Sequence, residues 1–453
     1  MYTTITVAAT LFASVYGQQA GTIKPEVHPK LGFQTCVKGG TCTPVDTAVT
    51  LDANWRWAHN KGKNCYTGTS WDATFCPDGA TCAKTCALDG ADYEKTYGVT
   101  TNNTHVTLKY VSKDQYGTSV GSRLYVMASE TKYQMFFPLN KEMTFDVDLS
   151  QLPCGLNGAV YFVAMPEDGG MSAYPDNKAG AKYGTGYCDT QCPHDIKWIA
   201  GEANVAGWNT TTAVGNYGAC CAEMDLWEAN SISTALTPHV CTTPEYKRCS
   251  GTECGDGDNR YGGICDKDGC DYNPTRMGNP DFYGPGKTID TKLPITVVTQ
   301  FITDDGTDTG NLKEVKRFYV QNGKVFANPN VNVPGVAPTN SITEEFCVAQ
   351  KTAFGDTNSF SKLGGMKAMG DAMKKGMVMV LSLWDDSVAQ MLWLDSNYHP
   401  GHDLTAPGAV RGTCNTTSGV PSESRLAYPT AQVAYGNLKF GEIGSTFNSA
   451  AAV

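Results

Sequence analysis

Eighteen cysteines limit the folds that are open to this chain of 453 residues. Their even number, and their position after an apolar N-terminal stretch, indicate a protein exported to an oxidising compartment, where cysteines pair as disulfides. The spacings are irregular, and Cys220 and Cys221 are adjacent, which makes zinc ligation a poorer explanation. The sequence therefore predicts a domain held together by disulfide bonds, with no metal ion.

The apolar stretch of residues 5–13 is followed by the small residues Val15 and Gly17, as in a secretory signal peptide, although no basic side chain precedes it. Residues 1–17 are therefore predicted to be a signal peptide, and the mature chain to begin at Gln18. We expect a secreted, extracellular protein. Three acceptor triplets for N-glycosylation fit this location: Asn102, Asn209 and Asn415.

The formal net charge is −10, and no basic patch stands out, which argues against a nucleic-acid-binding protein. Apart from the N-terminal stretch, no segment is apolar over the length needed to cross a membrane. Neither end carries a Ser/Thr/Pro-rich linker or a small cysteine-rich appendage. Residues 18–453 are therefore predicted to form a single domain, which we expect to be a monomer.

Short segments of alternating apolar and polar residues recur along the whole chain, which indicates β-strands. Helical patterns are clear only at 344–353 and 365–374. Strands without intervening helices predict an all-β fold, a two-sheet antiparallel sandwich. The expected strands are residues 49–57, 106–111, 123–128, 143–149, 159–165, 295–302, 314–321, 377–383 and 432–440.

Three carboxylates cluster in the segment Glu223-Met224-Asp225-Leu226-Trp227-Glu228. In a strand, Glu223 and Asp225 share a face, whereas Glu228 points the other way. A one-residue bulge between Asp225 and Glu228 would return Glu228 to that face, and bulges are common beside active sites. The two glutamate carboxyls would then lie about 5–6 Å apart, as the nucleophile and acid/base of a retaining glycosidase do. The alternative is a solvated acidic edge strand.

Four further motifs accompany this cluster: Trp55-Arg56-Trp57, Cys154-Gly155-Leu156-Asn157-Gly158-Ala159, Tyr183-Gly184-Thr185-Gly186-Tyr187-Cys188 and Leu383-Trp384-Asp385-Asp386. With it, they resemble the motifs of glycoside hydrolase family 7, and within that family those of the reducing-end cellobiohydrolases. The resemblance runs from about Gln18 to the C-terminus. It implies a concanavalin-like β-jelly-roll sandwich whose disulfide-stapled loops roof a cellulose-binding tunnel. It also implies a catalytic domain with no separate cellulose-binding module and no cofactor.

The resemblance assigns roles to the acidic cluster. Glu223 matches the family nucleophile, which must be ionised to attack the anomeric carbon. Glu228 matches the acid/base, which must begin protonated, so its pKa should be raised. Asp225 matches the residue that orients the nucleophile, and His239 matches a histidine that lines the same site.

The resemblance also assigns substrate contacts. Indole rings offer flat platforms to the apolar faces of glucose, and four tryptophans match tunnel platforms: Trp55, Trp57 near the entrance, Trp384 and Trp393 on the product side. Residues that match the central sugar sites are Asn157, Tyr161, Tyr187, Asp189 and Gln191. Residues that match the product sites are Arg260, Asp268, Arg276 and Arg411. Each of these polar groups could instead tether a loop.

The resemblance further implies nine disulfides, since spacing alone does not select a connectivity. The implied pairs are Cys36–Cys42, Cys65–Cys86, Cys76–Cys82, Cys154–Cys414, Cys188–Cys221, Cys192–Cys220, Cys241–Cys265, Cys249–Cys254 and Cys270–Cys347.

Cellulose chains and cello-oligosaccharides are the partners that the resemblance implies, with cellobiose released processively from reducing chain ends. An endo-β-1,4-glucanase of the same family is the nearest alternative. The cysteine-rich 241–270 loop and the 360–376 segment, both retained here, argue against it. The other alternative is a non-catalytic, lectin-like glucan-binding protein, which would not need both Glu223 and Glu228.

Overall fold

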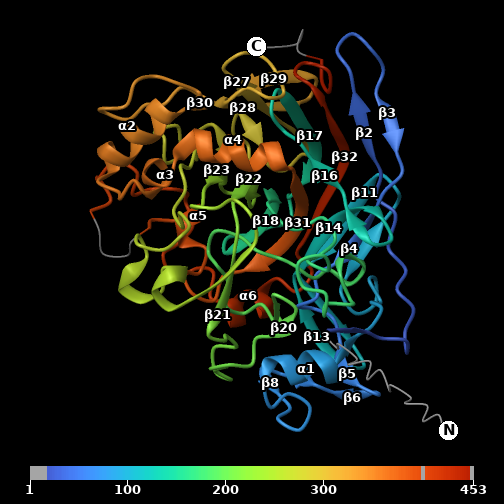
Figure 1. Ribbon diagram of the computed structural model, residues 1–453. Coiled ribbons are helices and arrows are strands. Elements are labelled where there is room, and N and C mark those ends of the chain that lie inside the picture. The colour runs from blue at the N-terminus through green and yellow to red at the C-terminus, as the bar shows by residue number, and fades with distance from the viewer. Residues whose placement is uncertain (1–17, 399–402, 449–453) are drawn as a thin grey trace, which may run out of the picture.

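The computed structural model describes residues 18–398 and 403–448 (Figure 1). Residues 1–17, where the signal peptide is predicted, lie outside the described part. The chain folds into two large, mostly antiparallel sheets packed on each other, together with several small sheets and short helices. This architecture confirms the predicted β-sandwich.

The first large sheet has ten strands. Seven form its continuous path, in the order β10 (Val99–Thr101), β11 (His105–Lys109), β32 (Gln432–Glu442), β17 (Lys141–Asp148), β27 (Ile295–Thr303), β28 (Leu312–Gln321) and β29 (Lys324–Ala327). Three more lie off this path: β2 (Phe33–Cys36) pairs with β32, β3 (Thr43–Val45) with β2, and β30 (Ser341–Ile342) with β28.

The second large sheet has eight strands and carries the acidic cluster. Its path is β15 (Lys132–Tyr133), β14 (Ser122–Ser129), β31 (Met377–Asp385), β18 (Leu156–Val163), β22 (Glu223–Ala229) and β23 (Thr234–His239), with β4 (Ala48–Leu51) and β16 (Met135–Phe136) beside it. The strand β22 therefore lies between β18 and β23, one strand from the edge.

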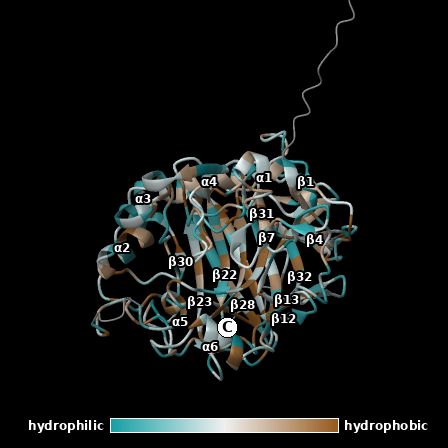
Figure 2. Ribbon diagram, turned by 90° about the horizontal axis from the view of Figure 1, so that it is seen from below, coloured by the Kyte–Doolittle hydropathy of each residue, from teal (hydrophilic) through white to brown (hydrophobic). Residues whose placement is uncertain are grey.

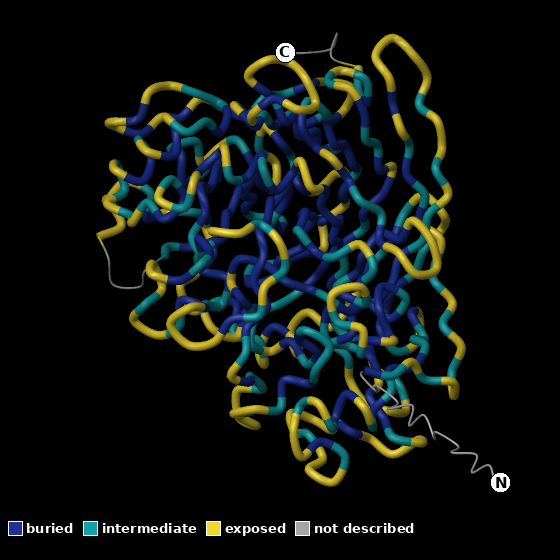
Figure 3. The backbone as a smooth tube through the Cα atoms, in the orientation of Figure 1, coloured by how far each residue is buried: buried dark blue, intermediate teal, exposed yellow. Residues whose placement is uncertain are grey.

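The main hydrophobic core lies between the two large sheets. In Figure 2 apolar residues colour the central strands, and in Figure 3 the buried part of the chain follows them while exposed segments lie in the outer loops. Side-chain alternation assigns each strand residue to one face: Val160 and Phe162 of β18 enter the core, whereas Tyr161 and Val163 join a second buried cluster. All eight residues of β18 are buried. The outer face of the second sheet is therefore covered too, by loops.

Small sheets and helices form these loops. The small sheets pair β1 (Gln19–Ala20) with β9 (Ala87–Leu88), β9 with β5 (Ala58–Asn60), β5 with β6 (Lys63–Asn64), β7 (Tyr66–Thr67) with β8 (Ser70–Trp71), β12 (Val111–Asp114) with β13 (Gly117–Val120), β19 (Trp198–Ile199) with β20 (Glu202–Ala203), β21 (Tyr217–Cys220) with β24 (Lys247–Ser250), and β25 (Tyr283–Gly284) with β26 (Ile289–Asp290). The helices are α1 (Gly79–Thr85), α2 (Glu344–Phe354), α3 (Ser359–Lys362), α4 (Gly365–Lys375), α5 (Leu392–Asp395) and α6 (Pro421–Ala427), with 3₁₀ turns at Ala181–Tyr183, Gly251–Cys254 and Gly257–Asn259. Among the described residues, no helix has the length and apolar character needed to cross a membrane.

The two predicted helices are confirmed as α2 and α4. Most predicted strands are confirmed with shifted ends; the segment 106–111 covers the end of β11 and the start of β12. The predicted strand 49–57 is wrong beyond Leu51. There the chain turns, with backbone bonds from Trp55 N to Asp52 O and from Arg56 N to Ala53 O. Trp55 and Trp57 therefore do not share a strand face, although their spacing in the sequence is that of a strand.

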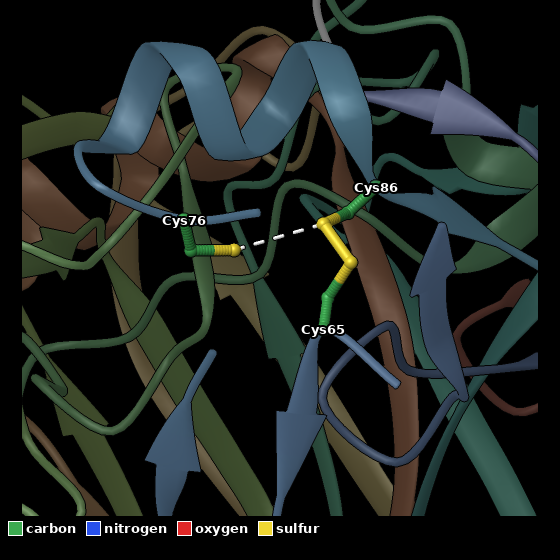
Figure 4. Close-up of side chains that lie close together, drawn as sticks. All are labelled: Cys65, Cys76 and Cys86. Carbon is green, nitrogen blue, oxygen red and sulfur yellow. Dashed lines mark hydrogen bonds between the residues drawn. A yellow bond between two sulfur atoms is a disulfide. The ribbon is translucent and has the colours of Figure 1, made fainter. Parts of the chain in front are cut away.

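All nine implied disulfides are confirmed, and no cysteine is free. Figure 4 shows Cys65 bonded to Cys86, with the Sγ of Cys76 only 3.6 Å from the Sγ of Cys86. The partner of Cys76 is Cys82. Three sulfurs thus meet in one buried spot, but all belong to disulfides and none is a thiolate that could bind a metal ion.

Candidate active site

A bulge in β22 gathers the three carboxylates on one face. The register on β23 shifts between Asp225 and Glu228, and on β18 the residues paired with Asp225 and Trp227 are adjacent, so Leu226 has no partner on either side. Leu226 and Trp227 consequently both enter the core. Asp225 and Glu228 both point away from it, beside Glu223. The bulge inferred from the sequence is confirmed.

Glu223 lies at the start of β22 and is 8% exposed. Its Oε2 accepts two hydrogen bonds from Thr190, from the backbone N–H at 3.2 Å and from Oγ1 at 2.8 Å. Burial raises the pKa of Glu223 well above its ordinary value, and the nearby Asp225 and Asp189 carboxyls add to the rise, whereas His239 and Thr190 lower it. Two donors on one oxygen favour the ionised form of this carboxyl.

Asp225 lies between Glu223 and His239. The Nε2 of His239 is 3.2 Å from Asp225 Oδ2, and its Nδ1 is 3.0 Å from the carbonyl oxygen of Asp266. A carbonyl oxygen only accepts, so Nδ1 carries the hydrogen in this contact. Burial, followed by Asp189, raises the pKa of Asp225 well above its ordinary value. The hydrogen bond with Glu223 acts the other way and lowers the pKa of Asp225, so the two buried carboxyls share a proton.

Glu228, beyond the bulge, remains partly exposed on the site side. Its Oε1 accepts a hydrogen bond of 2.9 Å from Asn157 Nδ2, and Asn157 Oδ1 accepts one of 3.0 Å from the backbone of Ala229. Burial raises the pKa of Glu228 well above its ordinary value, and the Asp225 charge adds to the rise. A raised pKa favours the protonated form of Glu228, and this form suits general acid catalysis.

A chain of hydrogen bonds joins three other predicted site residues. Tyr161 Oη lies 2.9 Å from Tyr187 Oη, and Tyr187 donates to Asp189 Oδ2 at 2.7 Å. Arg123 stacks on the Tyr187 ring, with its guanidinium carbon 3.3 Å from the ring centroid. Burial raises the pKa of Asp189. This chain lines the outer face of the second sheet next to Glu223.

Two tryptophans lie nearly parallel at the other end of this face. The rings of Trp384 and Trp393 have centroids 6.5 Å apart and planes inclined by 29°. Trp384 is in β31, and Trp393 is in α5. The indole N–H of Trp393 donates to Asp386 Oδ2 at 3.1 Å, and Asp386 Oδ1 accepts from two backbone N–H groups. Asp386 thus fixes the direction of the Trp393 ring.

The other two predicted platforms differ from each other. Trp57 is 37% exposed, stacks on His59 with ring centroids 4.0 Å apart, and donates from Nε1 to Asn64 Oδ1 at 2.7 Å. Trp55 packs partly against the main core and donates from Nε1 to the Val120 carbonyl. Trp57 therefore offers a supported open ring, and Trp55 offers less of one.

Arg260 and Gln191 meet at the loop that follows β24. Arg260 pairs with Asp268, with Nε 2.9 Å from Oδ1. Gln191 Nε2 and Arg260 Nη2 both donate to the carbonyl of Lys267. The structure thus places Arg260, Asp268 and Gln191 together.

Arg276 is only 4% exposed and is held by two carboxylates, Asp271 and Asp356. Burial alone would raise the pKa of Asp271, but Arg276 and then Arg411 lower it to about 2. Arg411 donates from Nη1 to the carbonyl of Trp393 at 3.1 Å. Both arginines tether loops, and any contact of theirs with sugar stays a prediction.

Sequence reasoning missed Thr190, Asp271 and Asp386. Thr190 stands between two predicted residues, Asp189 and Gln191, and Asp386 is in a quoted motif, so both positions carried a signal. Asp271 carried no such signal in the sequence, because only the folded loop brings its partner Arg276 close to it.

Comparison with known proteins agrees with this geometry. The profile of Glycosyl hydrolase family 7 matches residues 20–447. A cellobiohydrolase from Daphnia pulex is 51% identical, with a TM-score of 0.93 over 95% of this chain and 100% of that one. A cellobiohydrolase from Melanocarpus albomyces, solved in complex with cellotetraose, is 47% identical, with a TM-score of 0.90 over the same shares. An endocellulase from Humicola insolens is 37% identical, with a TM-score of 0.80, again over 95% of this chain and 100% of that one.

Because the family profile covers nearly the whole chain and a solved cellobiohydrolase is 51% identical to it, the chain belongs to glycosyl hydrolase family 7.

Proposed function

We propose that this protein is a secreted cellobiohydrolase that hydrolyses β-1,4-glucosidic bonds of cellulose with retention and releases cellobiose from reducing chain ends. The observation that carries the proposal is the bulged strand β22, which directs Glu223, Asp225 and Glu228 to one covered face. A non-catalytic lectin would gain nothing from burying three acidic side chains together, because each costs free energy to desolvate.

In the proposed reaction, Glu228 gives its proton to the departing glycosidic oxygen while Glu223 attacks the anomeric carbon. The product of this step is a glycosyl-enzyme. Glu228, now ionised, takes a proton from water, which attacks the same carbon, breaks its bond to Glu223 and restores the original configuration. Glu223 leaves as a carboxylate. Asp225, hydrogen-bonded to Glu223 and held by His239, orients the nucleophile.

The substrate class follows from the aromatic platforms and from the relatives. A Melanocarpus cellobiohydrolase binds cellotetraose, and by similarity we assign cellulose chains and cello-oligosaccharides to this protein. We propose Trp57, Trp384 and Trp393 as stacking platforms. The remaining proposed contacts with sugar are Trp55, Asn157, Tyr161, Tyr187, Asp189, Gln191, Arg260, Asp268, Arg276 and Arg411.

Exo rather than endo action is favoured by the loops. The loop between β23 and Cys270 keeps two disulfides, Cys241–Cys265 and Cys249–Cys254, and the segment that follows α2 keeps α3 and α4. Identity is also higher to cellobiohydrolases than to the endocellulase. Residues 18–453 are proposed to act as one monomeric catalytic domain. Secretion is supported by the nine disulfides, and Asn102, Asn209 and Asn415 are all exposed for glycosylation.

The proposal is tested by product profiles on two substrates. On crystalline cellulose we expect cellobiose as the dominant soluble product, and on soluble carboxymethylcellulose only a slow fall in viscosity. A rapid fall in viscosity with mixed oligosaccharides would identify an endoglucanase. Binding without any release of reducing sugar would identify the lectin-like alternative.

Trp57→Ala is expected to lower activity on crystalline cellulose roughly three- to tenfold, since an aromatic stacking contact contributes about 0.5–1.5 kcal/mol. Activity on a short soluble cello-oligosaccharide should change little, because it fills only the central sites. Trp57 is partly exposed, so the melting temperature should barely fall. The matched control is Trp71→Ala, in the half-buried cluster with Trp198 and Trp208. Trp71→Ala should lower both activities together with the melting temperature. If Trp57→Ala does the same, the role of Trp57 is packing.

A further inference from the structure

One charged side chain lies inside the sandwich core without a counter-ion. Arg317 belongs to β28 in the first sheet and is 1% exposed. Within the described part of the chain it forms no ion pair; its guanidinium lies 5.7 Å from the Trp227 ring centroid and 5.8 Å from that of Tyr319. Burial lowers its pKa from the ordinary value. A cation that is so costly to bury is expected to have a specific partner.

The partner is the carbonyl oxygen of Leu226. Arg317 donates to it from Nη2 and donates from Nε to Thr299 Oγ1 at 3.2 Å. Leu226 is the residue left without a register partner on both sides of β22. The guanidinium therefore reaches from one sheet across the core to the bulge in the other.

The contact between Arg317 and Leu226 matters because the bulge keeps Asp225 and Glu228 on the same face of β22. Asp225 precedes it and Glu228 follows shortly after, and only the extra residue lets both point to the site. Shifting a strand register by one residue sends every later side chain to the opposite face. A buried carbonyl at an interrupted ladder needs a donor, and a charged donor forms a stronger bond than a neutral one.

We propose that Arg317 is a positioning residue for the reaction: by binding the Leu226 carbonyl through the core, it holds the bulge that turns Glu228 to the face of Glu223. The inference rests on the proposed function, in which Glu228 is the acid. Arg317 itself touches no substrate. It acts through the backbone of β22.

The test compares two aryl cellobiosides. A phenyl leaving group needs a proton from Glu228, whereas a dinitrophenyl group departs without one. If Arg317 positions Glu228, Arg317→Met lowers kcat for the phenyl glycoside by about 100-fold, the loss typical of a catalytic group displaced by about 1 Å. For the dinitrophenyl glycoside the loss is less than about tenfold, and KM stays similar for both.

Arg317→Lys keeps the charge and a donor on a shorter arm, so the loss for the phenyl glycoside should be intermediate. It also carries the test if Arg317→Met does not fold. The matched control is Phe301→Leu, which removes core volume from β27 without touching the Arg317 contact and should reduce both rates only in step with the folded fraction. Folding is followed by melting temperature and near-ultraviolet circular dichroism.

Equal losses on the two glycosides in a folded Arg317 variant, or no loss on the phenyl glycoside, would overturn the proposal. Failure of the proposed function gives another result: wild-type protein that hydrolyses neither glycoside, or Glu223→Gln that still hydrolyses both. The wild-type enzyme and Glu223→Gln are therefore measured in the same series.

Discussion

Glu223→Gln is expected to lower the rate of hydrolysis by roughly 10⁴-fold or more, because an amide cannot attack the anomeric carbon and no covalent intermediate forms. Substrate binding and the fold should survive. The side chains have nearly the same shape, and an amide carries no charge beside Asp225 and Asp189, so we expect an equal or higher melting temperature. The measurements are turnover of a cello-oligosaccharide, its affinity by calorimetry, and thermal unfolding.

A variant with a smaller side chain at position 223 shows from which side of the sugar ring Glu223 attacks. Glu223→Ala leaves space where the proposed nucleophile stood, and azide supplied in solution should enter it and attack from that side. The product should be the α-cellobiosyl azide from a β-linked substrate. Contaminating wild-type enzyme gives no such azide, which separates true residual activity from carry-over. Turnover by Glu223→Gln within tenfold of wild type would remove Glu223 from the proposed role.

The strand content, the sandwich and the bulge could be predicted because they depend on local patterns. Alternation assigns side chains to faces, and two core residues in succession, Leu226 and Trp227, leave a bulge as the way to keep Glu228 with its partners. The disulfide pairing came from family resemblance, since cysteine spacing alone does not select partners.

Other features depended on tertiary contacts that no local pattern carries. The alternation of Trp55 and Trp57 resembles a strand, but Arg56 between them points inward. Its Nη1 donates at 2.5 Å to Oε2 of Glu26, which lies 30 residues earlier in the chain. The chain turns there, with backbone bonds from Trp55 N to Asp52 O and from Arg56 N to Ala53 O. Arg317 gave no functional signal, because it alternates in β28 like an ordinary strand residue and its partner is a backbone carbonyl in another sheet.

Glu228→Gln is expected to lower hydrolysis of cellulose and of phenyl cellobioside by about 10²–10⁴-fold, the usual contribution of a general acid. With the dinitrophenyl glycoside, formation of the glycosyl-enzyme should stay fast and its hydrolysis should become slow, because no base activates water. A burst of dinitrophenol followed by a slow steady state is the expected trace.

The raised pKa of Glu228 also fixes the direction in which activity should change with pH. Burial, with Asp225 adding to it, raises the pKa of Glu228, so wild-type activity is present below that raised pKa and is lost as the pH rises through it and the proton leaves. The alkaline limb should be absent from the burst rate of Glu228→Gln. Asn157→Ala removes a donor that favours the ionised form of Glu228 and should move the limb to higher pH. An unchanged alkaline limb in Glu228→Gln would mean that another group, and not Glu228, donates the proton.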